Sequence, residues 1–258
     1  MNEKIPIGVV SQMLGVNIQT LRRWDDDGSL NPDRSASLAH RYYTENQIGE
    51  FLSNNYKYLE KASREWAFGE SPTRIISKFH CPDKSIFKAR LSRLELLLSR
   101  DEYLSVDYKF SLVTSIVGEI GNNAFDHNIG MWPDATGVFF GYSLSERKII
   151  LADRGQGILT TLVRVKPELL NHKEALRVAF TEYISGRAPE NRGNGLKFVR
   201  EVIVGKSYDD TVPAVKIETL GLDFQSGDGK VIIKYDSDDL NIQNVEDSNK
   251  GCFILLKY

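Results

Sequence analysis

The 258-residue sequence is poor in cysteine, has no long apolar run and carries no large excess of charge of either sign. The two cysteines, Cys81 and Cys252, are far apart and lack metal-ligand spacing, which indicates a reduced, cytoplasmic protein without a cysteine metal site. Because no run approaches the ~18 apolar residues of a membrane helix, we expect no membrane contact. The formal net charge of −2 means that any nucleic-acid binding must come from local basic patches.

What the chain does contain is the composition of a globular protein, with 41% hydrophobic and 26% charged residues. The chain is long for one domain and comfortable for two, with enough residues to bury a core. We predict an α+β protein with a small domain at residues 1–55, a helical segment at residues 56–105 and a larger domain at residues 106–258.

Residues 5–27 have the pattern of two short helices around a tight turn at Gly15. The apolar positions that would face the core are Ile7, Val10 and Leu14 in the first helix, and Ile18, Leu21 and Trp24 in the second. The opposite face of the second helix carries side chains that can contact phosphates and base edges, namely Gln19, Thr20, Arg22 and Arg23.

This segment resembles the winged helix-turn-helix of the MerR family over residues 5–53. The resemblance rests on Leu21-Arg22-Arg23-Trp24 at the end of the second helix, on Gly28-Ser29-Leu30, and on Arg41-Tyr42-Tyr43 in a following hairpin. It implies DNA binding, with phosphates near Arg22, Arg23, Arg34, Arg41 and Tyr42. The alternative is a protein-docking or dimerising module, because residues 1–55 hold seven acidic side chains against five basic ones.

The middle segment, residues 56–105, is helical in pattern. Residues 84–98 place Phe87, Leu91, Leu94 and Leu98 on one face. Such a segment either dimerises the chain or packs onto the next domain, and the sequence leaves both open.

The larger domain is organised around a helix at residues 113–127, whose apolar stripe is formed by Val113, Ile116, Val117, Ile120 and Ala124. Glu119 and Asn123, four residues apart, lie at the border of this stripe. A carboxylate and an amide placed there could hold a hydrated divalent metal and position a water molecule. Further helices are predicted at residues 173–184 and 195–204, and strands at residues 137–144, 148–153, 215–219, 230–235 and 252–256.

Two glycine clusters complete the pattern. Asp153 ends a predicted strand and can accept a hydrogen bond from an exocyclic amine such as that of adenine. Gly155 and Gly157, which follow it, allow close backbone approach to a ligand. The second cluster, residues 192–196, precedes a helix whose free N–H groups form an anion site. The cations near it are Arg187, Arg192 and Lys197.

These three motifs, in this order, resemble the N, G1 and G2 boxes of the GHKL ATPases, which include gyrase, histidine kinases and MutL. The resemblance implies a Bergerat-fold sandwich, with a mixed sheet and helices on one face, that binds ATP and Mg²⁺. It makes Asn123 the metal ligand and Glu119 the general base, and it matches His127 to the end of the first box. The positions that would contact the nucleotide are Asn123, Asp153, Gly155, Gly157, Ile158, Arg187, Arg192, Gly193, Asn194, Gly195, Leu196 and Lys197.

The sequence therefore predicts an ATP-binding, DNA-binding regulator with slow ATPase activity. The alternative is a serine protein kinase or slow ATPase of the anti-sigma type, acting on a protein partner docked by the N-terminal domain. A third reading is a pseudo-ATPase in which the nucleotide is structural. A histidine autokinase is not expected, because neither His40 nor His80 lies in a long helical heptad pattern. The chain is either monomeric or a homodimer.

Overall fold

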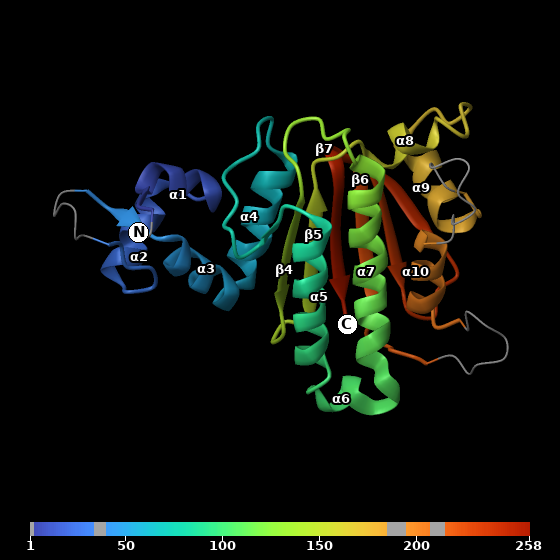
Figure 1. Cartoon of the computed structure of the whole chain (residues 1–258), viewed down its shortest axis with the longest axis horizontal. Coiled ribbons are helices and arrows are strands. Elements are labelled where there is room, and N and C mark those ends of the chain that lie inside the picture. Colours follow the sequence, from blue (N-terminus) through green and yellow to red (C-terminus); the bar gives the residue numbers. More distant parts are fainter. Residues whose placement is uncertain (1–2, 34–39, 185–194, 207–214) are drawn as a thin grey trace.

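The computed structural model describes residues 3–33, 40–184, 195–206 and 215–258. The first unit (residues 3–33 and 40–54) lies at one end of the long axis of the molecule (Figure 1). Its two-stranded sheet pairs the segment before the first helix with Tyr42 and Tyr43. Its elements are β1 (Ile5–Pro6), α1 (Ile7–Met13), α2 (Ile18–Asp26), β2 (Tyr42–Tyr43) and α3 (Glu45–Asn54).

Local capping explains where the helices of the first unit begin. The side chain of Asn17 accepts a hydrogen bond from the Thr20 amide at the start of α2. Thr44 and Gln47 form a reciprocal capping box at the start of α3. Of the core positions predicted in the first unit, Ile7 is partly buried and Ile18 is 39% exposed, so the expectation for Ile18 is wrong. Ile18 stands at the first position of α2, where it does not reach the core. The other predicted positions, Val10, Leu14, Leu21 and Trp24, are buried.

The second unit (residues 56–184, 195–206 and 215–258) is built on a five-stranded sheet with the order β3-β4-β5-β7-β6. All four neighbouring pairs are antiparallel, so the expected mixed sheet is wrong. Three of these pairs join consecutive strands, and in two of them, β4–β5 and β6–β7, the connection is so short that the strands must run antiparallel. The strands are β3 (His80–Cys81), β4 (Val138–Ser143), β5 (Lys148–Asp153), β6 (Gly221–Lys234) and β7 (Asn241–Lys257).

The strand expected at residues 215–219 is also wrong, because these residues lead into a turn and β6 begins at Gly221. Ile217 and Leu220 are buried there, and the Leu220 amide donates to the Ile217 carbonyl. Their apolar spacing therefore reflects burial in a turn.

Helices cover both faces of this sheet, which corrects the expectation of helices on one face. Helices α5, α7, α9 and α10 share a core with Phe140, Leu151 and Ile254, and α5 and α7 cross the front of the sheet in Figure 1. The alternate residues, such as Phe139 and Phe253, point to the other face and pack with α4. The helices are α4 (Tyr56–Phe68), α5 (Lys84–Leu98), α6 (Glu102–Ser105), α7 (Lys109–Asn128), α8 (Gly157–Leu162), α9 (His172–Thr181) and α10 (Gly195–Ile203).

The segment expected as a helical connector, residues 56–105, is packed into the second unit. Helix α4 lies on the sheet, β3 forms its edge strand, and α5 packs against α7. The domain boundaries at residues 55 and 105 stay a prediction. None of the described helices is long and apolar enough to cross a membrane.

Candidate functional sites

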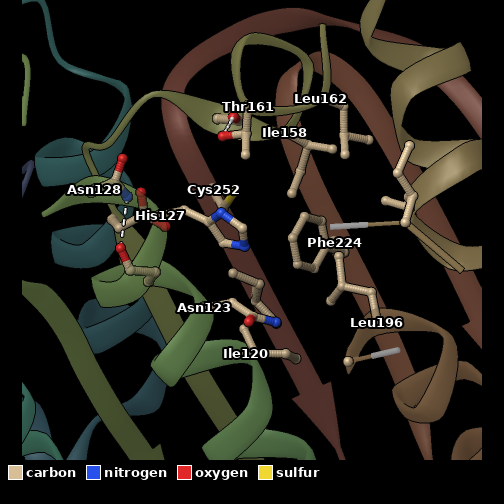
Figure 2. Close-up of a pocket in the computed structure, with 17 residues that line it drawn as sticks. Ile120, Asn123, His127, Asn128, Ile158, Thr161, Leu162, Leu196, Phe224 and Cys252 are labelled. Carbon is tan, nitrogen blue, oxygen red and sulfur yellow. Dashed lines mark hydrogen bonds between the residues drawn. The ribbon is translucent and has the colours of Figure 1, made fainter. Parts of the chain in front are cut away.

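A cavity opens between the C-terminal half of α7, helices α8 and α10, and the ends of β5, β6 and β7. The empty space within it is about 830 Å³ when the open mouth is included. Figure 2 shows Asn123 and His127 of α7 facing Phe224 and Leu196 across the cavity. The lining residues are Ile120, Asn123, Ala124, His127, Asn128, Asp153, Gly157, Ile158, Thr161, Leu162, Ala179, Ile184, Gly195, Leu196, Phe224, Cys252 and Ile254.

Residues from all three sequence motifs therefore reach one cavity. Asn123 comes from the first motif, Asp153, Gly157 and Ile158 from the second, and Gly195 and Leu196 from the third. The sequence predicted each of them as a nucleotide contact. The fold brings these segments together although they are far apart in the chain.

The polar edge of α7 lies directly against the start of α10. The Asn123 amide donates to Glu119 Oε1 at 3.3 Å, as expected for residues one helical turn apart. A Cβ atom on Gly195 would lie 1.9 Å from Glu119 Oε1 and 3.0 Å from Asn123 Nδ2. A side chain at position 195 would therefore displace the Glu119 carboxylate from its place beside the start of α10.

Asp153 forms a buried carboxylate in the cavity wall. It is 3% exposed, and its Oδ1 accepts a hydrogen bond from the Gly155 amide at 2.8 Å. Burial raises the pKa of Asp153 to about 7, although hydrogen bonds from the Gly155 backbone and from Cys252 act in the opposite direction. At neutral pH the carboxyl group thus populates both forms and can accept a proton or a hydrogen bond from a ligand.

The loop after Asp153 is held by Asn128, which the sequence analysis missed. Asn128 Oδ1 accepts from the Gln156 amide at 2.8 Å, and its Nδ2 donates to the Ala124 carbonyl at 2.7 Å. A Cβ on Gly155 would lie 2.0 Å from the Asn128 amide nitrogen. The close approach that requires Gly155 is therefore to Asn128, and Gly155 itself does not line the cavity.

Gly157 begins α8 with a left-handed φ of 74°. A Cβ at this position would lie 2.9 Å from Ser226 Oγ, and that hydroxyl accepts from the Ile158 amide at 2.9 Å. Both the backbone conformation and the contact favour glycine here.

The remaining wall is largely apolar and was not predicted. Phe224 on β6 and Leu162 on α8 contribute bulk, while Thr161 and Cys252 add small polar groups. No local pattern distinguishes these residues from ordinary core positions, so only the fold identifies them. An apolar pocket with a buried carboxylate at one end can hold a flat heterocycle that carries an amine.

The third motif is described only in part. Arg187, Arg192, Gly193 and Asn194 lie outside the described residues, whereas Gly195 and Leu196 line the cavity. The ammonium group of Lys197, also predicted as a nucleotide contact, lies 3.4 Å from the centroid of the Tyr183 ring and 4.0 Å from Glu201 Oε1. Lys197 does not line the cavity.

No group of three or more His, Cys, Asp and Glu side chains within the described ranges could hold a metal. Glu119 and Asn123 offer one carboxylate and one amide, which suits Mg²⁺ only when phosphate oxygens and water supply the other ligands. These two side chains alone therefore do not complete a metal site.

The first unit presents its own surface on α2. Gln19, Arg22 and Arg23 are exposed on the face opposite the buried Leu21 and Trp24. The hydroxyl of Thr20, also predicted as a DNA contact, lies 3.0 Å from Asn17 Oδ1 within the helix cap.

The hairpin residues predicted to contact DNA are less available than those of α2. Arg41 Nε donates to Asp25 Oδ2 at 2.7 Å, so its charge is already paired within the unit. Tyr42 is half-buried in β2, and Arg34 lies outside the described residues. The exposed basic groups from the predicted set are thus Arg22 and Arg23.

Comparison with known families gives a match for the first unit. Residues 5–53 match the family described as MerR HTH family regulatory protein, which confirms the resemblance at those residues. Comparisons with curated proteins and with solved structures gave no match. The match makes residues 5–53 a MerR-type helix-turn-helix and ends before the second unit, so the cavity is interpreted from its geometry.

Proposed function

We propose that the protein is a DNA-binding regulator whose second unit binds Mg·ATP in the cavity beside α7. The observation that carries the proposal is the convergence of Asn123, Asp153, Gly157 and Gly195 on one cavity. They come from all three motifs of a pattern that resembles the nucleotide site of the GHKL ATPases, with Asp153 and Gly157 both in the second motif.

The chemistry of the cavity favours a purine with an exocyclic amine. Asp153 accepts the adenine N6 hydrogen bond, and the apolar wall that includes Ile158 and Phe224 packs against the ring. Guanine presents a carbonyl at the corresponding position, so the same carboxylate disfavours it.

The phosphates are placed at the polar end of the cavity, where α10 begins. The first N–H groups of α10 form an anion site because they lack partners within the helix. Asn123 completes the coordination of Mg²⁺ together with phosphate oxygens and water. Glu119 accepts a proton from an attacking water molecule, which supports slow hydrolysis.

The first unit supplies DNA binding through α2. A MerR-type helix-turn-helix places its second helix in the major groove, and Gln19, Arg22 and Arg23 are exposed on that helix. Regulation then requires that the ATP-bound and free states differ in DNA affinity.

The test of nucleotide binding is calorimetric titration of the wild type with Mg·ATP and Mg·GTP, with phosphate release followed in the same sample. We expect ATP to bind more tightly than GTP, and Asp153→Asn to weaken ATP binding by about tenfold or more, the cost of one buried hydrogen bond. Glu119→Gln is the matched variant, which should retain binding and lose phosphate release. Absence of binding heat with both nucleotides would refute the proposal.

The charge of the first unit favours a second candidate function, in which this unit docks a protein. Residues 1–55 contain seven acidic and five basic side chains, and one of the basic side chains, Arg41, is paired with Asp25. Under this alternative, radiolabel from γ-labelled ATP is transferred to a co-purifying protein, and Glu119→Gln abolishes the transfer. Selection of genomic DNA fragments by the wild type but not by Arg23→Glu would instead support DNA binding.

A further inference from the structure

Arg154, the residue after Asp153, has the largest fully buried side chain in the part of the chain that is described. All five of its N–H donors have acceptors. Nε and Nη2 bind the two carboxylate oxygens of Asp134 at 3.0 and 2.6 Å. Nη1 donates to the Trp66 and Gly69 carbonyls at 2.6 and 2.9 Å, and Nη2 also reaches the Glu70 carbonyl at 3.4 Å.

The three carbonyl acceptors lie in the last turn of α4 and in the two residues that follow it, where carbonyls left unpaired by the helix favour a cation. A buried guanidinium is costly unless every donor is satisfied, and this one is satisfied by a single arrangement of backbone and carboxylate. Arg154 therefore ties the end of β5, which carries Asp153, to one specific position of the C-terminal end of α4.

A second cation reinforces the same connection. Lys250 Nζ lies 2.8 Å from Asp134 Oδ2 and 3.2 Å from the Glu70 carbonyl oxygen. The next residue, Gly251, is so close to Asp153 that a Cβ there would lie 2.3 Å from its Oδ1. Arg154 thus adjoins Asp153 in the sequence, and Lys250 adjoins Gly251, which contacts Asp153.

Helix α4 in turn contacts the first unit. Trp66 shares an apolar cluster with Met13 and Leu14 of the first unit and with Phe253 of the sheet. A Cβ on Gly15, in the turn between α1 and α2, would lie 2.4 Å from the Glu65 carboxylate. A displacement of the end of α4 therefore reaches the helix-turn-helix directly.

We propose that Arg154 is a positioning residue that transmits occupation of the cavity to the helix-turn-helix through the last turn of α4. The inference rests on the proposed nucleotide function. A ligand that engages Asp153 shifts the backbone of the next residue, and the fully bonded guanidinium carries that shift into the three carbonyls. Close-packed contacts of this kind respond by moving as a unit.

The test is hydrogen exchange of the full chain with and without saturating Mg·ATP. In the wild type we expect slower exchange both at the cavity (residues 123–128 and 157–162) and at a remote set (residues 13–24 and 63–70), by about tenfold or more. Arg154→Lys keeps the charge but loses the fork geometry. It should retain ATP-induced protection at the cavity and reduce the remote protection to less than about twofold.

The matched control is Arg147→Lys, which alters another ion pair of the second unit, that of Arg147 with Asp101 at 2.7 Å. It should leave the remote protection unchanged. If Arg154→Lys does not fold, Lys250→Met tests the same network. Lys250 is 47% exposed, so the loss of its ammonium group should be tolerated. Lys250→Met should at least halve the logarithm of the ATP-induced protection factor at the remote set.

A purely structural role of Arg154 would change exchange in the free protein but not the ATP-induced difference. Remote protection that persists in Arg154→Lys or Lys250→Met would overturn the inference. Protection of the cavity without any remote effect in the wild type would also overturn it and leave the nucleotide site intact. No protection at the cavity in the wild type would instead refute the proposed nucleotide binding.

Discussion

Replacing Asp153 by asparagine should change how the stability of the protein depends on pH. Burial raises the pKa of Asp153 to about 7, whereas an aspartate in the unfolded chain has a pKa of ~3.9. The folded state thus binds a proton more tightly than the unfolded state. The stability associated with the protonated form is complete below the unfolded pKa and is lost as the pH rises from about 4 to about 7.

The size of this effect follows from the two pKa values. Their difference corresponds to a change of roughly 4 kcal/mol in the free energy of unfolding between low and high pH. Urea unfolding would also detect an effect half as large. Asparagine has nearly the same shape but does not titrate. It can still accept from the Gly155 amide but not from Cys252, so a constant penalty of about 1 kcal/mol is expected at every pH.

The assay is urea unfolding of both proteins between pH 4.5 and 8. We expect the stability of Asp153→Asn relative to the wild type to rise by several kcal/mol across this range. Asp134→Asn is the contrasting control. Arg154 holds the pKa of Asp134 below its usual range. The stability that the ionised Asp134 carboxylate contributes is therefore lost only as the pH falls below about 4, so the stability difference between Asp134→Asn and the wild type should stay constant between pH 4.5 and 8. A difference between wild type and Asp153→Asn that stays constant with pH would refute the reasoning.

Three further predictions test the packing and surface of the molecule. Gly195→Ala should push aside the Glu119 carboxylate, which the new Cβ would meet at 1.9 Å, and should lower phosphate release about tenfold or more with little change in the melting temperature. Gly121→Ala should lower the free energy of unfolding in urea by about 2–3 kcal/mol, because its Cβ would lie 2.0 Å from the buried ring of Phe87. Arg23→Glu should abolish retention on DNA, measured by gel shift, without changing the melting temperature.

The last two of these predictions have a control in the chain. Gly118→Ala faces only the flexible end of Leu91 at 3.1 Å and should be nearly neutral or slightly stabilising. Arg100→Glu reverses an exposed charge on the second unit and should leave DNA retention unaffected. Equal stability of Gly121→Ala and Gly118→Ala, or equal loss of retention in both charge reversals, would contradict the respective argument.

Much of the site could be predicted because its residues obey local rules. The helix that carries Glu119 and Asn123 follows from an apolar spacing of three and four residues, and it extends from Lys109 to Asn128 in the structure. The position of Asp153 at the end of a strand follows from the apolar run before it. Asn128 could not be predicted, because a polar residue at the end of a helix is ordinarily a cap.

The arrangement of layers was harder to predict, although the strands contained a clue. Phe139 and Phe140 are adjacent, so their side chains point to opposite faces of β4, and both are buried. The same holds for Ile150 and Leu151 in β5. Continuous apolar runs of this kind indicate a sheet covered on both sides. The expectation of one covered face came from the family resemblance, and α4 fills the other face.

Helix α4 also explains why the two units are better regarded as coupled than as simply joined. One core contains Leu14 and Leu52 of the first unit, Trp66 of α4, and Phe139 and Phe253 of the sheet. The two units therefore cannot separate without exposing part of this core to water, at a cost of about 25 cal/mol per Å² of apolar surface. Small adjustments within the shared core cost less than separation. We therefore expect any effect of a nucleotide on DNA binding to involve repacking around α4.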